Sequence, residues 1–196
     1  MAFYPGASST SANVSSTAEK DVEVTDSPPD SISSLSFCPV RIYEVGANGQ
    51  TQGKAIKVIS GGGDNAARLY DIQTGQSQQV AQHDAPVKVV KWLETPQGSI
   101  LVTGSWDKTI KYWDMRTANP VSTVQLLERC YTLDVSYPLM VVGTAERHVQ
   151  IFNLTNPTTP YKTMPSPLKW QTRVISCFPN STGFAMGSVE GRVAIQ

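Results

Sequence analysis

The sequence predicts an all-β fold, an incomplete β-propeller built from repeated sheets, and three observations predict it. The apolar runs have the length of single strands, and none keeps a helical apolar period beyond two turns. One turn element also recurs four times, with leading glycines at 61, 104, 143 and 187 and therefore intervals of 43, 39 and 44 residues. A unit of that length matches a propeller blade of four strands. We count about four to five such blade signals.

Residues 1–31 precede these units and differ from them in composition. They are rich in Ser, Thr, Ala and Pro and end in TDSPPDS. Such a segment has too little apolar surface to offset the entropy lost on ordering. We therefore expect a disordered tail over 1–31 and a partial propeller over 32–196.

Beyond the tail, short apolar runs alternate with Gly, Pro, Asn and Asp. Runs of this length bounded by turn residues are typical of strands. Clear examples are VKVVKW (87–92), SILVTGS (99–105), LMVVGTA (139–145) and RVISCF (173–178).

The recurring element carries an acid three positions after its glycine, and these acids are Asp64, Asp107, Glu146 and Glu190. A short acidic side chain at a tight turn accepts hydrogen bonds from the turn amides. We therefore expect each acid to lie at the turn between two strands of one sheet.

The second copy of the element, GSWDKTIKYWD, resembles the WD-repeat family. Members of that family often tie the turn aspartate to a histidine of the preceding loop, a Ser or Thr, and a Trp. The resemblance gives these roles to Asp107, His83 and Trp113, with Thr103 or Ser105 as the hydroxyl. The tetrad it implies is structural; a catalytic His–Asp pair is the alternative.

Charge and apolar patterning exclude some classes of protein. Sixteen basic residues balance sixteen acidic ones, which argues against a dominant electrostatic grip on nucleic acid or on an anionic membrane. No apolar run approaches the roughly 20 residues that span a bilayer, and no signal peptide is evident. We expect an intracellular protein without membrane insertion.

Cysteine and histidine are too few and too scattered for a metal centre. Cys38, Cys130 and Cys177 form no CxxC pair, and His83 and His148 share no ligand-like spacing with them. We expect buried, reduced thiols, no metal and no cofactor.

Three longer stretches narrow the resemblance to the nuclear-pore mRNA export proteins among the WD-repeat proteins. The spindle-checkpoint WD-repeat proteins are close to them and share the EGRVA element. The resemblance implies a non-catalytic, seven-bladed ring at the nuclear pore, partly cytoplasmic, that holds the GLEBS segment of a nucleoporin. A mitotic checkpoint adaptor that binds checkpoint-kinase-type GLEBS proteins is the alternative. The stretches are AQHDAPVKVVKW (81–92), LLERCYTLDVSYPLMVVGTAERHVQIFNL (126–154) and STGFAMGSVEGRVAIQ (181–196).

The same resemblance points to a peptide-binding arginine. In these relatives the arginine of EGRVA pairs with a glutamate of the bound segment, and here it is Arg192, with Glu190 two positions earlier. A guanidinium offers a carboxylate two parallel donors in one plane. The alternative is that Arg192 only covers the face of a strand.

The family also contacts single-stranded RNA through basic and aromatic residues near the rim. Lys88, Lys91 and Lys111 would form a modest basic patch for that purpose. Scattered surface lysines are the alternative.

The chain is shorter than the resemblance requires. Seven blades of about 42 residues need roughly 300 residues. The endings Tyr43-Glu44 and Tyr70-Asp71 lie 27 residues apart, whereas Asp71 and Asp114 lie 43 apart. We expect a truncated, internally shortened propeller with uncovered sheet faces, and a non-functional isoform is a further alternative.

A propeller enzyme with a site in the central channel belongs to a different class of function. It would require inward-facing acids, histidines or metal ligands on successive blades. The repeated acids are instead expected at turns, and the chain has two histidines. We therefore expect no enzyme.

Overall fold

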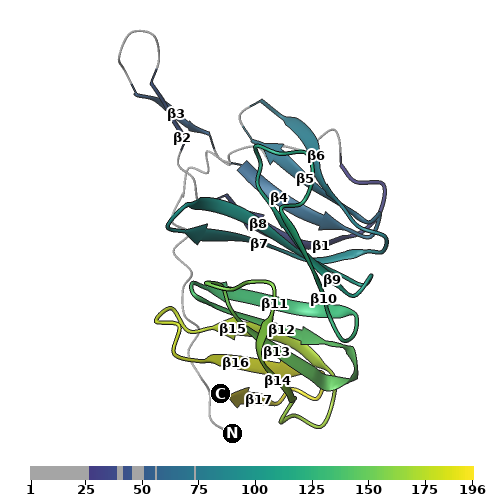
Figure 1. Ribbon diagram of the computed structural model, residues 1–196. Helices are drawn as coiled ribbons and strands as arrows, with labels where there is room; N and C mark the ends of the chain where they lie inside the picture. The colour runs from purple at the N-terminus through teal and green to yellow at the C-terminus, as the bar shows by residue number, and fades with distance from the viewer. Residues whose placement is uncertain (1–26, 39–41, 46–50, 56, 73) are drawn as a thin grey trace, which may run out of the picture.

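A computed structural model describes residues 27–38, 42–45, 51–55, 57–72 and 74–196. The first 26 residues of the predicted tail lie outside these ranges. The described residues form four antiparallel sheets that follow one another in chain order, and one separate hairpin (Figure 1). This architecture is an incomplete β-propeller, as the repeat predicted.

We number the sheets 1 to 4 along the chain. Sheets 1 to 3 have four strands and sheet 4 has three. In sheet order the strands are β1 (Ile32–Phe37), β4 (Lys57–Gly62), β5 (Ala66–Asp71) and β6 (Gln76–Gln82); β10 (Ser122–Gln125), β9 (Thr109–Trp113), β8 (Gly98–Ser105) and β7 (Val87–Thr95); β11 (Cys130–Ser136), β12 (Leu139–Thr144), β13 (His148–Asn153) and β14 (Pro160–Pro165); and β15 (Thr172–Cys177), β16 (Phe184–Ser188) and β17 (Val193–Ile195).

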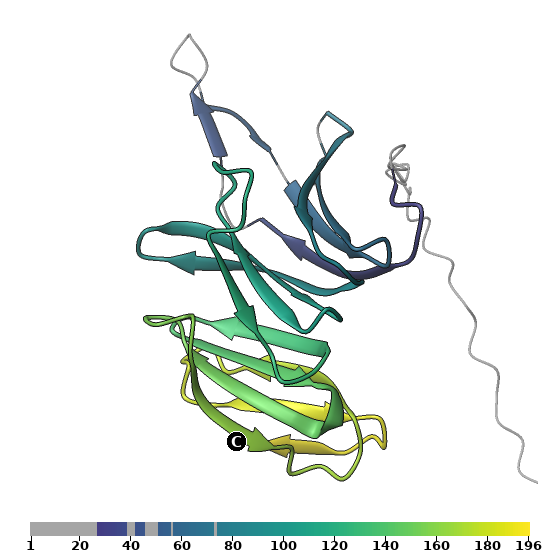
Figure 2. The same ribbon diagram turned by 45° about the vertical axis from the view of Figure 1, so that its right-hand side comes forward.

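The place where the sequence seemed shortened has an unusual strand order. Strand β1 pairs with β4, although β2 (Ile42–Val45) and β3 (Thr51–Ala55) lie between them in the chain. Strands β2 and β3 pair with each other and project from the stack of sheets (Figures 1 and 2). Sheet 1 thus reaches four strands by skipping a hairpin.

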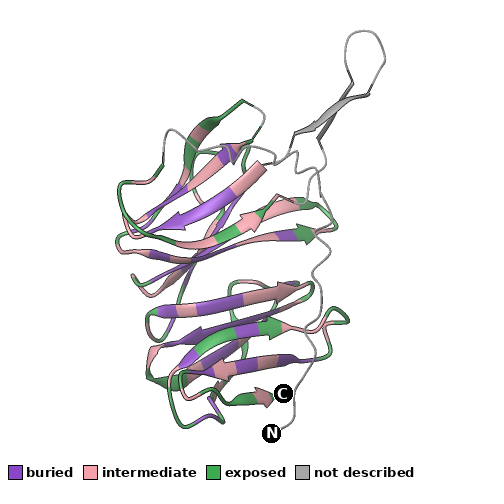
Figure 3. Ribbon diagram, turned by 180° about the vertical axis from the view of Figure 1, so that it is seen from behind, coloured by how far each residue is buried: buried purple, intermediate pink, exposed green. Residues whose placement is uncertain are grey.

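Three apolar clusters join the sheets in sequence. The buried residues are distributed along the strands of all four stacked sheets (Figure 3). Ile59 and Val90 are fully buried between sheets 1 and 2, and Leu133 is buried between sheets 2 and 3. Met186 is buried between sheets 3 and 4. Each sheet therefore buries a face against its neighbour, as propeller blades do.

The four sheets share local geometry beyond their strand order. The first strand of each sheet has a bulge directly after its first residue. In each sheet, the backbone amide that follows the recurring Gly-Ser, or the equivalent pair, also donates a hydrogen bond to the carbonyl of the residue just before the first strand. The donor–acceptor pairs are Gly63 to Ser31 (2.8 Å), Trp106 to Pro86 (3.0 Å), Ala145 to Arg129 (2.9 Å) and Val189 to Gln171 (3.1 Å).

The acidic turns reverse the chain through left-handed backbone. The residue after the acid has φ of 68° at Asn65, 66° at Lys108, 63° at Arg147 and 78° at Gly191. Asp107 Oδ1 accepts from the Thr109 amide at 2.9 Å, as expected for an acid at this turn. The four turns therefore share one backbone geometry. Each residue near a turn can be assigned an equivalent at the same position in the other sheets.

Candidate functional site

The structure brings together His83, Thr103, Asp107 and Trp113 of the predicted tetrad. His83 Nδ1 lies 2.8 Å from Asp107 Oδ2, and His83 Nε2 lies 2.7 Å from Thr103 Oγ1. The indole of Trp113 donates to Thr103 Oγ1 at 2.8 Å. The side chain of His83 is fully buried, so this network is internal to sheet 2.

The network fixes the protons of the imidazole. The carboxylate of Asp107 only accepts, so Nδ1 of His83 carries the hydrogen and Nε2 accepts from the Thr103 hydroxyl. Burial lowers the pKa of His83, and the hydrogen bond to Asp107 opposes this only in part. The histidine is therefore neutral, and it joins a loop to a turn.

Asp107 is held as a carboxylate. Burial alone would raise its pKa, but the hydrogen bonds from Thr109 and His83 outweigh that effect and lower it. Ser105, the alternative hydroxyl, takes another role: its Oγ donates to the Ala85 carbonyl at 2.9 Å and accepts from the Asp107 amide at 3.1 Å.

Sheets 3 and 4 fill the equivalent space with apolar side chains. In sheet 3, Leu126, Val142 and Phe152 occupy the positions of His83, Thr103 and Trp113, and all three are buried. In sheet 4, Leu168 and Met186 occupy the positions of His83 and Thr103, and both are buried. A hydrogen-bonded tetrad is one of two ways in which this chain fills the site.

Sheet 1 has neither the hydrogen-bonded tetrad of sheet 2 nor the apolar side chains of sheets 3 and 4 at these positions. Its equivalents of Thr103 and Trp113 are Ser60 and Tyr70, but Pro28 stands where the histidine would be. Ser60 Oγ and Tyr70 Oη are buried, and neither has a hydrogen-bond partner among the residues that the structure describes. A buried hydroxyl without a partner destabilises the fold.

The tetrad lies at one end of the sheets, which we call the turn rim. It comprises the acidic turns 62–66, 105–109, 144–148 and 188–192 and the loops before β7, β11 and β15. Four large apolar side chains are exposed on it: Trp106 at 39%, Leu127 at 52%, Trp170 at 54% and Val189 at 48%. Exposed apolar side chains gathered on one side of a protein are typical of a binding surface.

These four residues were not predicted from the sequence. Trp106 and Val189 follow the serine of the recurring Gly-Ser, so the repeat itself carried a signal. Trp106 makes an edge-to-face contact with Tyr131, with ring centroids 6.4 Å apart. The ammonium of Lys169 lies 5.7 Å from the ring centroid of Trp170. The turn rim therefore presents both apolar and positively charged side chains.

Arg192 and Glu190 lie in the turn of sheet 4, on the same rim. Arg192 occupies the position of Thr109 and its side chain is 76% exposed. Its Nε lies 3.7 Å from Glu190 Oε2, and Glu190 Oε1 accepts from Ser188 Oγ at 3.3 Å. The glutamate is thus largely covered, whereas the guanidinium extends toward solvent.

The structure does not bring Lys88, Lys91 and Lys111 together. Lys91 Nζ lies 2.9 Å from Asp134 Oδ1 of sheet 3. Lys111 Nζ donates to the Gln82 carbonyl of sheet 1 at 3.0 Å. Lys91 and Lys111 therefore reach opposite neighbours of sheet 2 and form no single patch with Lys88.

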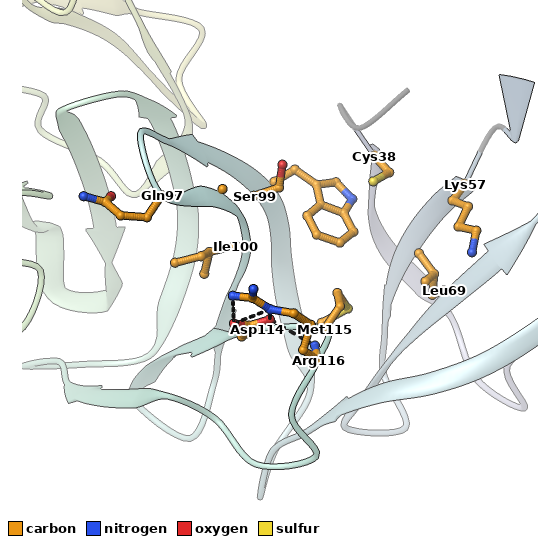
Figure 4. A pocket seen from close by; sticks show the side chains of 11 residues that line it. Cys38, Lys57, Leu69, Gln97, Ser99, Ile100, Asp114, Met115 and Arg116 are labelled. Atoms are coloured by element: carbon orange, nitrogen blue, oxygen red, sulfur yellow. Dashed lines mark hydrogen bonds and ion pairs between the residues drawn. The ribbon is translucent and has the colours of Figure 1, made fainter. Parts of the chain in front are cut away.

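A cavity of about 450 Å³ lies at the opposite end of sheets 1 and 2. Figure 4 shows Cys38, Lys57 and Leu69 on one side of it and Ile100 and Met115 on the other. None of the predicted site residues lines it. Within the described ranges no group of histidine, cysteine or acidic residues is arranged to hold a metal ion, and no helix is long and apolar enough to cross a membrane.

A family model described as "WD domain, G-beta repeat" matches residues 75–114, which contain the whole tetrad. In structure the chain is similar to the computationally designed Ika4 protein, with a TM-score of 0.65 and 19% identity over 87% of this chain and 93% of that one. That similarity concerns the fold alone. Four stacked antiparallel sheets, the tetrad and the family match define a WD-repeat protein.

Comparison with curated proteins identifies its relatives. The mRNA export factor GLE2 of Chaetomium thermophilum is 47% identical over 222 residues, covering 96% of this chain and 62% of the relative. The poly(A)+ RNA export protein of Schizosaccharomyces pombe is 47% identical over 225 residues (99% and 64%), and the mRNA export factor of Xenopus tropicalis is 44% identical over 213 residues (90% and 58%). The chain is thus a homologue of the mRNA export factors and spans less than two thirds of their length.

The matches also bear on the predicted internal shortening. The match with the S. pombe protein extends over 225 positions, although this chain has 196 residues. The relative therefore has additional residues inside the matched region.

Proposed function

We propose that the chain is a non-enzymatic WD-repeat scaffold in nuclear mRNA export. Its homologues are named for that process in two fungi and a frog. We further propose that the turn rim binds a GLEBS-type peptide of a nucleoporin, through Arg192 and Glu190. The corresponding location is the nucleus and the nuclear pore complex, with some protein in the cytoplasm.

The observation that carries the peptide proposal is the exposure of Arg192 beside exposed apolar side chains. Val189 lies in the same turn and Trp170 in the neighbouring loop, both about half exposed. An arginine that spans two carboxylate oxygens gives orientation, and apolar contacts around it exclude water. A peptide that combines a glutamate with apolar side chains fits this surface.

Glu190 acts as a positioning residue in this proposal. Held by Ser188, it keeps the Arg192 guanidinium near the turn without enclosing it, because the nearest approach is 3.7 Å. The carboxylate of a bound peptide can therefore accept hydrogen bonds from the guanidinium nitrogens of Arg192 that are not paired with Glu190. Replacing Glu190 by Gln would keep the shape and remove the local negative charge.

Peptide binding tests the proposal directly. A fluorescent nucleoporin GLEBS peptide is titrated with the chain and with Arg192→Ala, and we expect affinity to fall several-fold or more. The matched control is Arg116→Ala, since Arg116 is also exposed and paired with an acid but lies at the opposite end. Equal affinity for wild type and Arg192→Ala would reject the site.

The same titration addresses the alternative that the shortened chain is non-functional. That alternative predicts no saturable binding by the wild-type chain, whereas a wrong site predicts binding that Arg192→Ala leaves intact. The two failures are therefore distinguishable.

We also propose contact with single-stranded RNA, supported by the RNA export names of the relatives. Of the three predicted lysines, Lys91 and Lys111 are held by protein partners. Among the described residues, no ion pair or hydrogen bond holds the ammonium of Lys88, so we assign the contact to Lys88. Crosslinking to a labelled oligonucleotide, compared between wild type and Lys88→Ala, tests this contact. Unchanged crosslinking would remove Lys88 from the proposal.

A mitotic spindle checkpoint adaptor that binds checkpoint-kinase-type GLEBS proteins is the second candidate, because it would use the same rim. Localisation separates the two. Nuclear-rim signal in interphase supports mRNA export, whereas signal confined to kinetochores supports the checkpoint role.

A further inference from the structure

The cavity between sheets 1 and 2, at the end opposite the turn rim, corresponds to a space that is filled between sheets 2 and 3. There Tyr112 of β9 is buried, and its hydroxyl donates to the Pro157 carbonyl at 3.2 Å. The equivalent residue of sheet 1 is Leu69, because both pair with the residue two positions before the recurring glycine of their sheet. Leu69 lacks the ring of tyrosine, and it lines the cavity (Figure 4).

Two further residues of the cavity wall differ from their equivalents between sheets 2 and 3. Leu154 is buried in that interface, whereas Met115, at the same place in sheet 2, is 36% exposed and lines the cavity. Trp92 of β7 is larger than its equivalent Val135 of β11, yet a cavity of about 450 Å³ remains beside it. An apolar cavity of about 150 Å³ holds benzene, so two fused aromatic rings fit in this one.

Two hydrogen-bond donors at the cavity have no close partner among the described residues. The indole nitrogen of Trp92 is buried without a hydrogen-bond partner. The ammonium of Lys57 lies 3.9 Å from Asp71 Oδ2, which is beyond hydrogen-bond distance. Asp114, the acid in the wall, is instead held by three hydrogen bonds from the Arg116 guanidinium. The cavity therefore favours a ligand with negatively charged acceptor oxygens.

We propose that this cavity binds a small aromatic carboxylate with one ring or two fused rings. The ring takes the place that the Tyr112 ring fills in the next interface, against Leu69 and Met115. The carboxylate accepts hydrogen bonds from the Lys57 ammonium. A volume of about 300–1,000 Å³, apolar walls and a few polar groups are typical of small-molecule sites. This site is separate from the turn rim and does not depend on peptide binding.

Calorimetric titration with naphthalene-2-carboxylate tests the proposal, and naphthalene-2-carboxamide is the uncharged probe of the same shape. We expect the carboxylate to bind saturably and more tightly than the amide. Leu69→Tyr introduces the ring that sheet 2 carries at this position, and it should weaken both probes by about tenfold or more. Ile151→Tyr is the matched control, because Ile151 has the same position in sheet 3 and should leave both affinities unchanged.

Lys57→Met separates the effect of charge from that of shape. It should weaken the carboxylate by about two- to fivefold, as expected for a partly exposed ion pair, and leave the amide unchanged. NMR with ¹³C-methyl methionine locates the probe, since the chain has five methionines. We expect a nuclear Overhauser effect between the bound carboxylate and the Met115 methyl group, whose signal Met115→Leu identifies. This measurement decides the site even if Leu69→Tyr fails to fold.

The absence of saturable carboxylate binding would overturn the proposal, as would equal affinity for the amide. Unchanged affinity in a folded Leu69→Tyr chain or in Lys57→Met would also overturn it, and so would contacts of the probe with methionines other than Met115 alone. Because the peptide titration concerns the opposite end of the sheets, failure of either proposal leaves the other open to its own test.

Discussion

Removing the same kind of hydroxyl from sheets 1 and 2 should change stability in opposite directions. Thr103→Val keeps the side-chain shape but strands His83 Nε2 and the Trp113 N–H, which it now bonds at 2.7 and 2.8 Å. Each stranded buried group costs about 1–3 kcal/mol, so for the two groups we expect a loss of about 2–6 kcal/mol. Ser60→Ala removes a hydroxyl that has no described partner and should add about 0.5–1.5 kcal/mol.

Urea unfolding followed by both tryptophan fluorescence and circular dichroism measures these free energies. Agreement of the two probes and an unchanged slope permit comparison of midpoints. All variants are measured at one protein concentration. Thr123→Val, at an exposed position on β10, is the control and should stay within about 0.5 kcal/mol of wild type. Equal signs for Thr103→Val and Ser60→Ala would refute our account of the tetrad and its incomplete equivalent.

Three further predictions concern titration, packing and thiols. Because burial lowers the pKa of His83 below its ordinary 6.5, the unfolded chain binds the proton first, so stability should fall as pH drops below about 6.5; His83→Gln should flatten that part of a pH series of urea midpoints. Gly104→Ala would place a β-carbon 2.5 Å from Cys130 Sγ and should cost about 1–3 kcal/mol, and adding Cys130→Ala should recover part of that loss in the same assay. Burial raises the pKa of the Cys130 and Cys177 thiols to about 12, so mass spectrometry should find iodoacetamide on them at pH 8 only after unfolding.

The sequence was sufficient for the fold because the repeat is marked by local chemistry. The glycine-to-acid spacing depends on a tight turn with left-handed backbone, and that requirement recurs in all four sheets. The roles of His83, Asp107 and Trp113 followed from one copy of the motif. The choice between Thr103 and Ser105 did not, because two hydroxyls two residues apart point to the same side of a strand.

Other features depend on contacts between distant residues. The pairing of β1 with β4 crosses a hairpin, and no local pattern predicts which edge a strand joins. The lysines were grouped by type and spacing, yet Lys91 and Lys111 face opposite sheets, where Asp134 and the Gln82 carbonyl hold them. The exposed Trp106 was taken only as part of a motif, because exposure depends on what the neighbouring loop covers.

The detour between β1 and β4 should also set the order of folding. Joining β1 to β4 across the β2–β3 hairpin closes a longer loop, and therefore costs more chain entropy, than joining β7 to β8 through a two-residue turn. Sheets 2 and 3, joined by short local connections, are then expected to nucleate the molecule, with β1 docking last. In a nascent chain, β1 would therefore stay unpaired until β4 had been synthesised and had begun to pair with β5.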